Sequence, residues 1–391
     1  MMSFSIMIFG LCEFQQARAQ SEMLDVRISL LTCTPGPDLY SVFGHSAIRV
    51  QSEITGRTVD WVYNYGTFQF DDSFYLKFAR GKLDYILSKS DFADFQYEYI
   101  VTGRGIFEQE LKLDDNQKNE LIGLLEENHK PENRIYRYHF FYDNCSTRIR
   151  DIVVKSTNGS VNFTYTYGAE YTFRQSIQKY LDYMPWSDFG IDIALGMPCD
   201  KVMQKGDAMF LPDSIMNEFN YAAIGESSLA FPINEILPTD FELIPPGFFT
   251  PMVVFILFLI VHVAIGIFFA KRKKMFQITD RTILLVTGLL GLLIVFLWFF
   301  TDHTTTKWNL NILWANPLNL ILAFALPSRK SKFVNQYIQG YFLILVLFLS
   351  GYFFLPQEFN AAILPLIFAL LFTIIKLLYP NFISGKPKLN V

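Results

Sequence analysis

The stretch DNCSTRIRDIV, from Asp143 to Val153, passes from polar residues to an apolar helical period within one turn. The pattern predicts a helix that begins at or just before Cys145, with Asp143 as its cap. A thiol at a helix N-terminus lies near the positive end of the helix dipole and near N–H groups without partners inside the helix. Both features lower its pKa and favour the thiolate, and the same N–H groups can bind the oxyanion of a tetrahedral intermediate. Cys145 is therefore the candidate nucleophile.

Strand-like and helix-like segments surround this predicted helix. Residues 26–31, 46–51 and 58–65 alternate as strands do, and a turn at Thr55-Gly56-Arg57 separates the last two. Residues 114–129 have the amphipathic pattern of a helix, and residues 134–142 are aromatic and strand-like. Because helices and strands are segregated along the chain, the predicted class of this half is α+β.

A nucleophilic cysteine needs a base within hydrogen-bond distance. Outside the apolar C-terminal third, the available histidines are His45, His129 and His139. His45 follows Phe43-Gly44 at the head of a predicted strand, where glycine allows another backbone to approach closely, so His45 is the preferred base. The next strand carries two polar residues, Tyr63 and Asn64, and strand alternation puts only one of them on the His45 side.

The N-terminus has the pattern of an export signal. Residues 3–11 are a short apolar run and Ala17-Arg18-Ala19 fits a cleavage site, so residues 1–19 are expected to be a signal peptide. Three of the four cysteines follow this segment: Cys33, Cys145 and Cys199. In an oxidising compartment an odd number leaves at least one free thiol or an intermolecular bridge. Cys33 and Cys199 lie in loops with proline or glycine and could pair, although the sequence does not establish the bridge.

The last third of the chain is predicted to cross a membrane five times. Each apolar stretch is near the ~20 residues that a span needs, and the stretches cover residues 249–270, 282–300, 311–327, 338–355 and 361–379. Basic residues follow the first, third and fifth stretches, so these ends are cytoplasmic by the positive-inside rule. Residues 20–247 then form a periplasmic catalytic domain, and residues 248–391 form an all-α, five-helix transmembrane domain in a bacterial inner membrane.

A polar loop leads from the second span into the third. It contains His303, Asn309 and Asn311 and continues into Trp314-Ala315-Asn316-Pro317. Polar side chains in hydrocarbon are costly, so these residues are expected either to take part in function or to cap and pack helices, and the sequence leaves both open. Lys376, near the cytoplasmic end of the last span, is interpreted as a side chain that snorkels to the interface.

Composition excludes other classes of protein. The net charge is -4 and no basic excess is present, so no nucleic-acid partner is expected. The sequence shows no cluster of residues with metal-ligand spacing, so neither a metal nor another cofactor is expected.

The settings of the candidate residues resemble the circularly permuted papain-like (NlpC-type) fold, which includes the LRAT-type lipid acyltransferases. Phe-Gly-His stands at a strand head, Tyr63-Asn64 lies on the next strand, and Asn144-Cys145 begins a helix. In that group the orienting residue lies on the strand after the histidine, so the resemblance assigns this role to Asn64. An asparagine carbonyl can accept from one imidazole nitrogen and leave the other facing the sulfur.

A closer resemblance is to the Lnb-type lipoprotein N-acyltransferases. It rests on FGHSAIRV from Phe43, YNYGTF from Tyr63, FARGKL from Phe78 and FFYDNCSTR from Phe140, and it covers nearly the whole chain. The resemblance implies that Cys145 takes an acyl chain from a membrane phospholipid as a thioester. It further implies transfer to the α-amino group of a diacylated lipoprotein's N-terminal cysteine.

Further residues are candidates for orienting or binding these substrates. A guanidinium can bind phosphate bidentately, which makes Arg49, Arg80 and Arg148 candidates, although an ordinary ion pair is the simpler interpretation of each. Asn144, beside the nucleophile, is another. Two alternatives stay open: a membrane-tethered cysteine amidase or peptidase acting on the cell wall or peptides, and a non-catalytic assembly protein in which Cys145 is structural.

Overall fold

A computed structural model describes residues 24–54, 57–68, 77, 79–164, 168, 170–268, 273–325 and 332–379. The expected signal peptide lies outside these residues. The chain forms two compact units. Unit 1 consists of the chain up to Tyr75, Lys82–Glu170 and Met203–Leu243, and unit 2 of Leu76–Gly81, Tyr171–Val202 and Ile244–Val391. Residues 171–202 thus belong with the apolar helices, whereas the sequence alone suggested a single division after residue 247.

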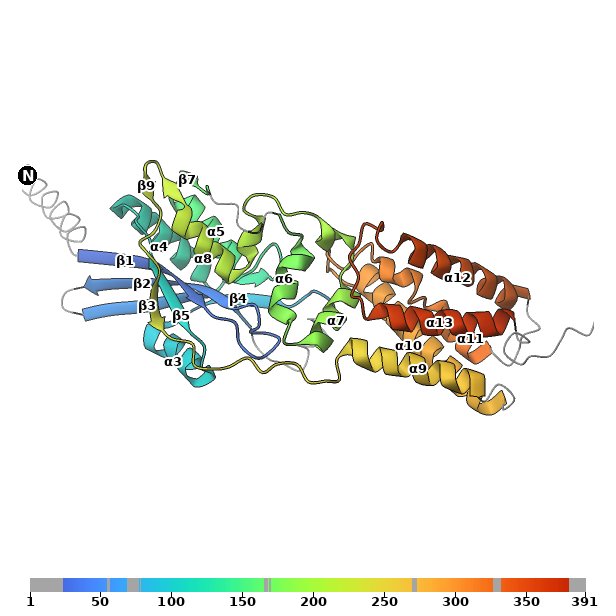
Figure 1. Cartoon of the computed structure of the whole chain (residues 1–391). Coiled ribbons are helices and arrows are strands. Elements are labelled where there is room, and N and C mark those ends of the chain that lie inside the picture. Colours follow the sequence, from blue (N-terminus) through green and yellow to red (C-terminus); the bar gives the residue numbers. More distant parts are fainter. Residues whose placement is uncertain are drawn as a thin grey trace, which may run out of the picture. The chain divides into compact units, whose positions relative to one another are not determined.

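Unit 1 is built on a seven-stranded sheet in the order β10-β5-β1-β2-β3-β4-β6, and Figure 1 labels its strands β1 to β5. Every neighbouring pair is antiparallel. The strands are β1 (Leu24–Cys33), β2 (His45–Ile54), β3 (Arg57–Thr67), β4 (Asp84–Asp91), β5 (Ile106–Glu110), β6 (Ile135–Arg137) and β10 (Asn234–Leu237). The predicted strands at 26–31, 46–51 and 58–65 are confirmed as parts of β1, β2 and β3.

Helices cover both faces of this sheet, with α3 on one side and α4, α5 and α8 on the other (Figure 1). Helix α3 (Phe92–Thr102) packs Phe95 and Tyr99 against Leu31, Ala47 and Val62. The larger core joins alternate strand residues such as Ile28 and Leu30 to the apolar sides of α4 (Asp115–His129), α5 (Cys145–Ser156) and α8 (Pro212–Tyr221). The period of two along the strands therefore separates two cores.

The predicted amphipathic helix at 114–129 is confirmed as α4. Asp114 is its N-cap, with its side chain on the Gln117 N–H and the Gln117 side chain on the Asp114 N–H. The predicted strand at 134–142 is shorter than expected, because only Ile135–Arg137 pair with β4. A small second sheet joins β7 (Val161–Asn162), β8 (Ala223–Ile224) and β9 (Ser227–Ser228), and the 3₁₀ turn η2 (Asp207–Phe210) leads into α8.

Unit 2 is helical. Three described segments are long and apolar enough to cross a membrane: α9 (Pro251–Phe268), Ile278–Phe299 within α10 (Lys273–Phe299), and α12 (Lys332–Gly351). Two shorter apolar stretches, Leu310–Phe324 and α13 (Ile363–Leu378), coincide with the expected third and fifth spans. Unit 2 also contains α6 (Phe173–Leu181), α7 (Pro185–Ala194) and the 3₁₀ turn η1 (Met197–Asp200).

The third apolar stretch is broken into the 3₁₀ turn η3 (Leu310–Leu313) and α11 (Leu318–Ala325). Its irregular backbone packs on two glycines of α10. A Cβ added to Gly291 would lie 2.3 Å from the Ala315 carbonyl oxygen, and one added to Gly288 would lie 2.7 Å from the Leu320 nitrogen. Side chains at these positions would push the broken segment away, so the glycines allow it to sit against α10.

Lys376 does not snorkel to the interface as the sequence suggested. Its side chain is buried and its ammonium lies 2.5 Å from Asp280 Oδ1 on α10. Thr373 donates to the same carboxylate oxygen at 2.8 Å and lies 3.0 Å from His262 Nε2 on α9. Asp280, which the sequence analysis did not single out, therefore holds three helices together, because a buried charge needs a partner of opposite sign.

Candidate active site

Helix α5 begins at Cys145, as predicted, but its cap is Asn144 and not Asp143. Asn144 Oδ1 accepts from the Thr147 N–H at 2.9 Å, and Thr147 Oγ1 accepts from the Asn144 N–H at 2.8 Å. The Asn144 amide nitrogen also donates to the carbonyl oxygens of Phe140 and Phe210, each at 2.7 Å. Asn144 therefore fixes the helix start and has no donor left for a substrate. Asp143 instead pairs with Arg148, because its carboxylate matches the guanidinium fork.

Cys145 is the first residue of this helix, and its side chain is in the larger core, 8% exposed. A hydrogen bond between the hydroxyls of Ser46 and Ser146, 3.0 Å long and fully buried, joins the helix start to β2. Ser46 directly follows His45 and Ser146 directly follows Cys145. The contact therefore brings His45 near Cys145, which lies a hundred positions later in the sequence.

His45 Nε2 lies 2.6 Å from Asn64 Oδ1. The register explains why Asn64 rather than Tyr63 reaches the histidine. Ile48 on β2 faces Tyr63 on β3, and both side chains lie in the larger core. Alternation places His45 and Asn64 on the opposite face. The hydroxyl of Tyr63 donates to Glu126 instead.

Gly66 lets the imidazole and the thiol meet. The register between β3 and β4 shifts between Asn64 and Thr67, and Gly66 has a φ of 96° in this irregularity. A Cβ built on Gly66 would lie 3.6 Å from His45 Cε1 and 3.8 Å from Cys145 Cβ, so the glycine backbone faces both side chains. No role was predicted for Gly66 within the YNYGTF motif, although a glycine within a strand pattern itself indicates a bulge.

The electrostatics of the pair favour a thiolate and an imidazolium. Burial alone would raise the pKa of Cys145, but the His45 charge and hydrogen bonds from His45, the Ser46 N–H and Ser146 bring it below the ordinary value. Burial alone would lower the pKa of His45, yet Cys145 and then Asn64 raise it. Since Asn64 occupies Nε2, the remaining nitrogen, Nδ1, is the one available to the sulfur.

The other two cysteines of the described chain behave differently. Cys33 and Cys199 are free, buried thiols, and Cys33 belongs to unit 1 and Cys199 to unit 2. Burial raises the pKa of each to about 12. Neither is poised for nucleophilic attack, because only the thiolate is a good nucleophile.

The arginines proposed for phosphate have other partners. Arg49 pairs with Asp60 at 2.6 Å and Glu108 at 3.1 Å, and its guanidinium stacks over Phe92. Arg148 pairs with Asp143 and lies 3.7 Å from the Tyr136 ring centroid. Both guanidinium groups are therefore held in ion pairs within the chain. Arg80 is exposed, and its carbonyl accepts from the Asp302 N–H within unit 2.

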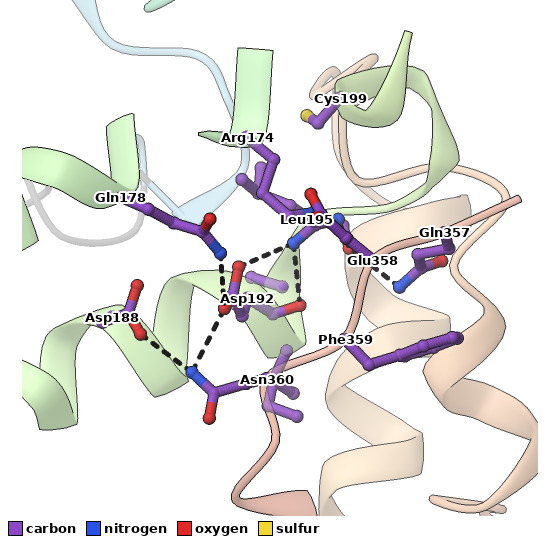
Figure 2. A network of polar contacts seen from close by, with 12 residues as sticks. Arg174, Gln178, Asp188, Asp192, Leu195, Cys199, Gln357, Glu358, Phe359 and Asn360 are labelled. Carbon is purple, nitrogen blue, oxygen red and sulfur yellow. Dashed lines mark hydrogen bonds and ion pairs between the residues drawn. The ribbon is translucent and has the colours of Figure 1, made fainter. Parts of the chain in front are cut away.

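A second polar centre, in unit 2, surrounds Arg174 of α6 (Figure 2). The fully buried guanidinium pairs with Asp192 of α7 at 2.8 Å and with Asp200 of η1 at 2.7 Å, and it donates to the Leu195 carbonyl at 3.1 Å. The Asn360 amide reaches both Asp188 and Asp192 from the segment before α13. This network ties residues 171–202 to the membrane unit, and the sequence analysis missed it because Arg174 lies between 18 and 26 residues from its acidic partners.

The polar loop before α11 belongs to the same centre. Asn309 donates to the Ile193 carbonyl at 2.8 Å, and Asn311 donates to the Asp192 carbonyl and accepts from the Trp314 indole. Asn316 accepts from the Leu318 N–H at the start of α11. These three asparagines thus cap and pack, which was one of the two expectations. A Cβ added to Gly81 would lie 3.1 Å from the His303 main-chain nitrogen and 3.2 Å from its imidazole ring.

Within the described ranges, no group of three or more His, Cys, Asp or Glu side chains could hold a metal ion.

An α/β unit with a paired thiol and imidazole, joined to a unit of apolar helices, defines a membrane-anchored protein with a candidate cysteine nucleophile. Comparison with protein families is specific: residues 13–179 match the Lnb N-terminal periplasmic domain, and residues 244–381 match the Lnb transmembrane domain, a domain of five transmembrane helices. The chain therefore belongs to the Lnb family, a family of lipoprotein N-acyltransferases. Its N-terminal domain is periplasmic and its C-terminal domain spans the membrane several times. No match was found among curated proteins or among solved structures.

Proposed function

We propose that this protein is a lipoprotein N-acyltransferase with a Cys145–His45–Asn64 triad on a permuted papain-like domain. It would move an acyl chain from a membrane phospholipid to the α-amino group of a diacylated lipoprotein's N-terminal cysteine. The observation that carries the proposal is the hydrogen-bonded His45–Asn64 pair beside the only cysteine of the described chain whose pKa is lowered. Membership of the Lnb family supports the choice of substrate class.

The first step forms a thioester. The Cys145 thiolate attacks an ester carbonyl of the phospholipid, and the first-turn N–H groups of α5 stabilise the oxyanion. Collapse breaks the bond to the glycerol oxygen, which takes the proton from His45 and leaves as a lysophospholipid. Asn64 holds Nε2 throughout, so the proton moves through Nδ1. Cys145 now carries the acyl group and His45 is neutral.

The second step transfers the acyl group to nitrogen. The lipoprotein amine attacks the thioester carbonyl, and His45 accepts a proton from the amine as the C–N bond forms. Collapse expels the Cys145 thiolate and restores the thiolate–imidazolium pair. The burial of Cys145 suits this step because water, the competing nucleophile, has little access to the sulfur.

A hydrolase would form the same thioester and differ only in the acceptor. The test is therefore intact mass spectrometry of the protein purified with its native lipids, wild type against Cys145→Ser, followed by analysis of lipoprotein N-termini from the same cells. We expect an acyl-sized, hydroxylamine-sensitive adduct in wild type only, and lipoproteins without the N-acyl chain in the variant. Cys33→Ser is the matched control and should behave as wild type. Fully N-acylated lipoproteins in cells that hold only Cys145→Ser would refute the proposal.

A further inference from the structure

Arg104 is a buried cation near the candidate triad that the sequence analysis did not single out. It follows the left-handed Gly103 that ends α3, and it is 5% exposed. Its Nε donates to the Thr34 carbonyl oxygen at 2.9 Å, and its guanidinium carbon lies 4.7 Å from the Tyr99 ring centroid. Thr34 comes directly after Cys33, which pairs with His45 across β1 and β2. Arg104 is therefore held at the end of the sheet where His45 lies.

The Arg104 guanidinium is incompletely satisfied. Its Nη2 atom is buried and has no hydrogen-bond partner in the described part of the chain. Arg49 and Arg148, in contrast, each pair with a carboxylate within 4 Å, and no such pair is found for Arg104 among the described residues. Buried polar groups in proteins almost always have partners, so a buried donor without one indicates a ligand, an ion or water. An arginine with a free N–H favours an oxyanion.

The loop between β1 and β2 indicates which oxyanion. Gly36 of this loop lies against Arg104, because a Cβ at Gly36 would come 3.0 Å from Arg104 Cδ. Two neighbouring loop residues, Leu39 and Tyr40, are 45% and 75% exposed. Exposed aliphatic and tyrosine side chains beside a basic group are typical of proteins that contact the headgroup level of a lipid bilayer. A lipid phosphate fits this setting better than free phosphate does.

We propose that Arg104 binds the phosphate group of the phospholipid that donates the acyl chain to Cys145. This inference rests on the acyltransferase function proposed above and adds the binding determinant for the donor. The phosphate and the scissile ester are carried by the same glycerol. A phosphate held at Arg104 would therefore limit the positions of the ester carbonyl relative to the sulfur, which is how a remote contact favours reaction at the reacting centre. Arg104 is then a binding residue and does not act on the reacting atoms.

The test measures donor binding apart from chemistry. Full-length Cys145→Ala protein in detergent is titrated with dihexanoyl phosphatidylglycerol and with dihexanoylglycerol, which has the same chains and glycerol but no phosphate. We expect the additional change Arg104→Gln to weaken phosphatidylglycerol binding roughly ten- to hundredfold, the range for a lost charged hydrogen bond, and to leave dihexanoylglycerol binding unchanged. Arg137→Gln removes an exposed charge of the same unit and is the matched control. Inorganic phosphate is the third titrant, and we expect it to bind far more weakly than phosphatidylglycerol.

Three results would overturn the inference. One is equal weakening for both lipids, which indicates a structural role; another is no weakening for either. The third is tight, Arg104-dependent binding of inorganic phosphate alone. Should Arg104→Gln fail to fold, Arg104→Lys carries the test, because it keeps the charge but loses the planar fork, and the same selective weakening is expected to a smaller extent. If lipoproteins are fully N-acylated in cells that hold only Cys145→Ser while phosphatidylglycerol binding still depends on Arg104, the proposed function fails and the phosphate site stands.

Discussion

Replacing Arg174 with methionine should release residues 171–202 from the membrane unit. The substitution removes the cation that pairs with Asp192 and Asp200, whose side chains are only 2% and 6% exposed, and leaves both carboxylates buried (Figure 2). Breaking a buried ion pair on one side costs about 3–5 kcal/mol. At about 1.4 kcal/mol per factor of ten, local opening of this segment should become roughly two to four orders of magnitude more frequent.

Cys199 reports this opening. It is fully buried beside Asp200, with its sulfur 3.6 Å from the Thr305 carbonyl oxygen, so a maleimide reaches it only when η1 detaches. The assay is the rate of maleimide labelling of the full chain in detergent, in a Cys145→Ser background, resolved by peptide mass spectrometry. When closing is fast compared with labelling, the rate follows the open population. Cys33, 1% exposed in unit 1, is the internal control.

We expect Arg174→Met to accelerate labelling of Cys199 by the factor given above and to leave Cys33 unchanged. Arg174→Lys should give an intermediate rate, because an ammonium cannot serve Asp192, Asp200 and the Leu195 carbonyl from one planar fork. If Cys199 stays as protected as in wild type, the network does not hold the segment. If Cys33 accelerates equally, the effect is global unfolding and the local interpretation is refuted.

Substitutions at three further positions test the candidate site and the acidic network. Asn64→Ala should slow thioester formation by about a hundredfold, measured by rapid-quench mass spectrometry, because a misplaced imidazole costs that order of rate; an unchanged rate would exclude an orienting role. Gly66→Ala should slow the same step through backbone strain at the φ of 96°, because the new methyl would have room at 3.6 Å from His45 Cε1. Asparagine tolerates positive φ better than alanine does, so Gly66→Asn should retain more activity than Gly66→Ala. Burial and then the charge of Asp192 raise the pKa of Asp188 to about 6. The ionised form is thus disfavoured in the folded state, and thermal stability should fall as the pH rises from about 4 to 6. Asp188→Asn should flatten this pH dependence of the melting temperature, and an identical dependence in the variant would contradict the assignment.

Patterns within a few residues were sufficient to predict several features. The start of α5 follows from the polar-to-apolar switch at Cys145, the amphipathic pattern of residues 114–129 places α4, and long runs of Leu, Ile, Phe and Val indicate the membrane spans. These features depend on local hydrogen bonds and on the transfer of side chains out of water, and both are encoded in adjacent residues. The predicted cap, Asp143, was wrong because either residue type can cap a helix. Asp143 pairs instead with Arg148, five residues further along the chain.

The tertiary structure decided the pairings. The register of β2 and β3 selects Asn64 over Tyr63. The positions of the carboxylates show that Arg49 and Arg148 form ion pairs, whereas Arg104 has a buried donor without a partner in the described part of the chain. Lys376 also carries no local sign of its partner, Asp280, ninety-six positions earlier. Periodicity fixes which face a residue occupies, whereas a salt bridge or a triad requires groups far apart in sequence to meet within about 3 Å. That proximity depends on how the elements pack, and no local pattern specifies it.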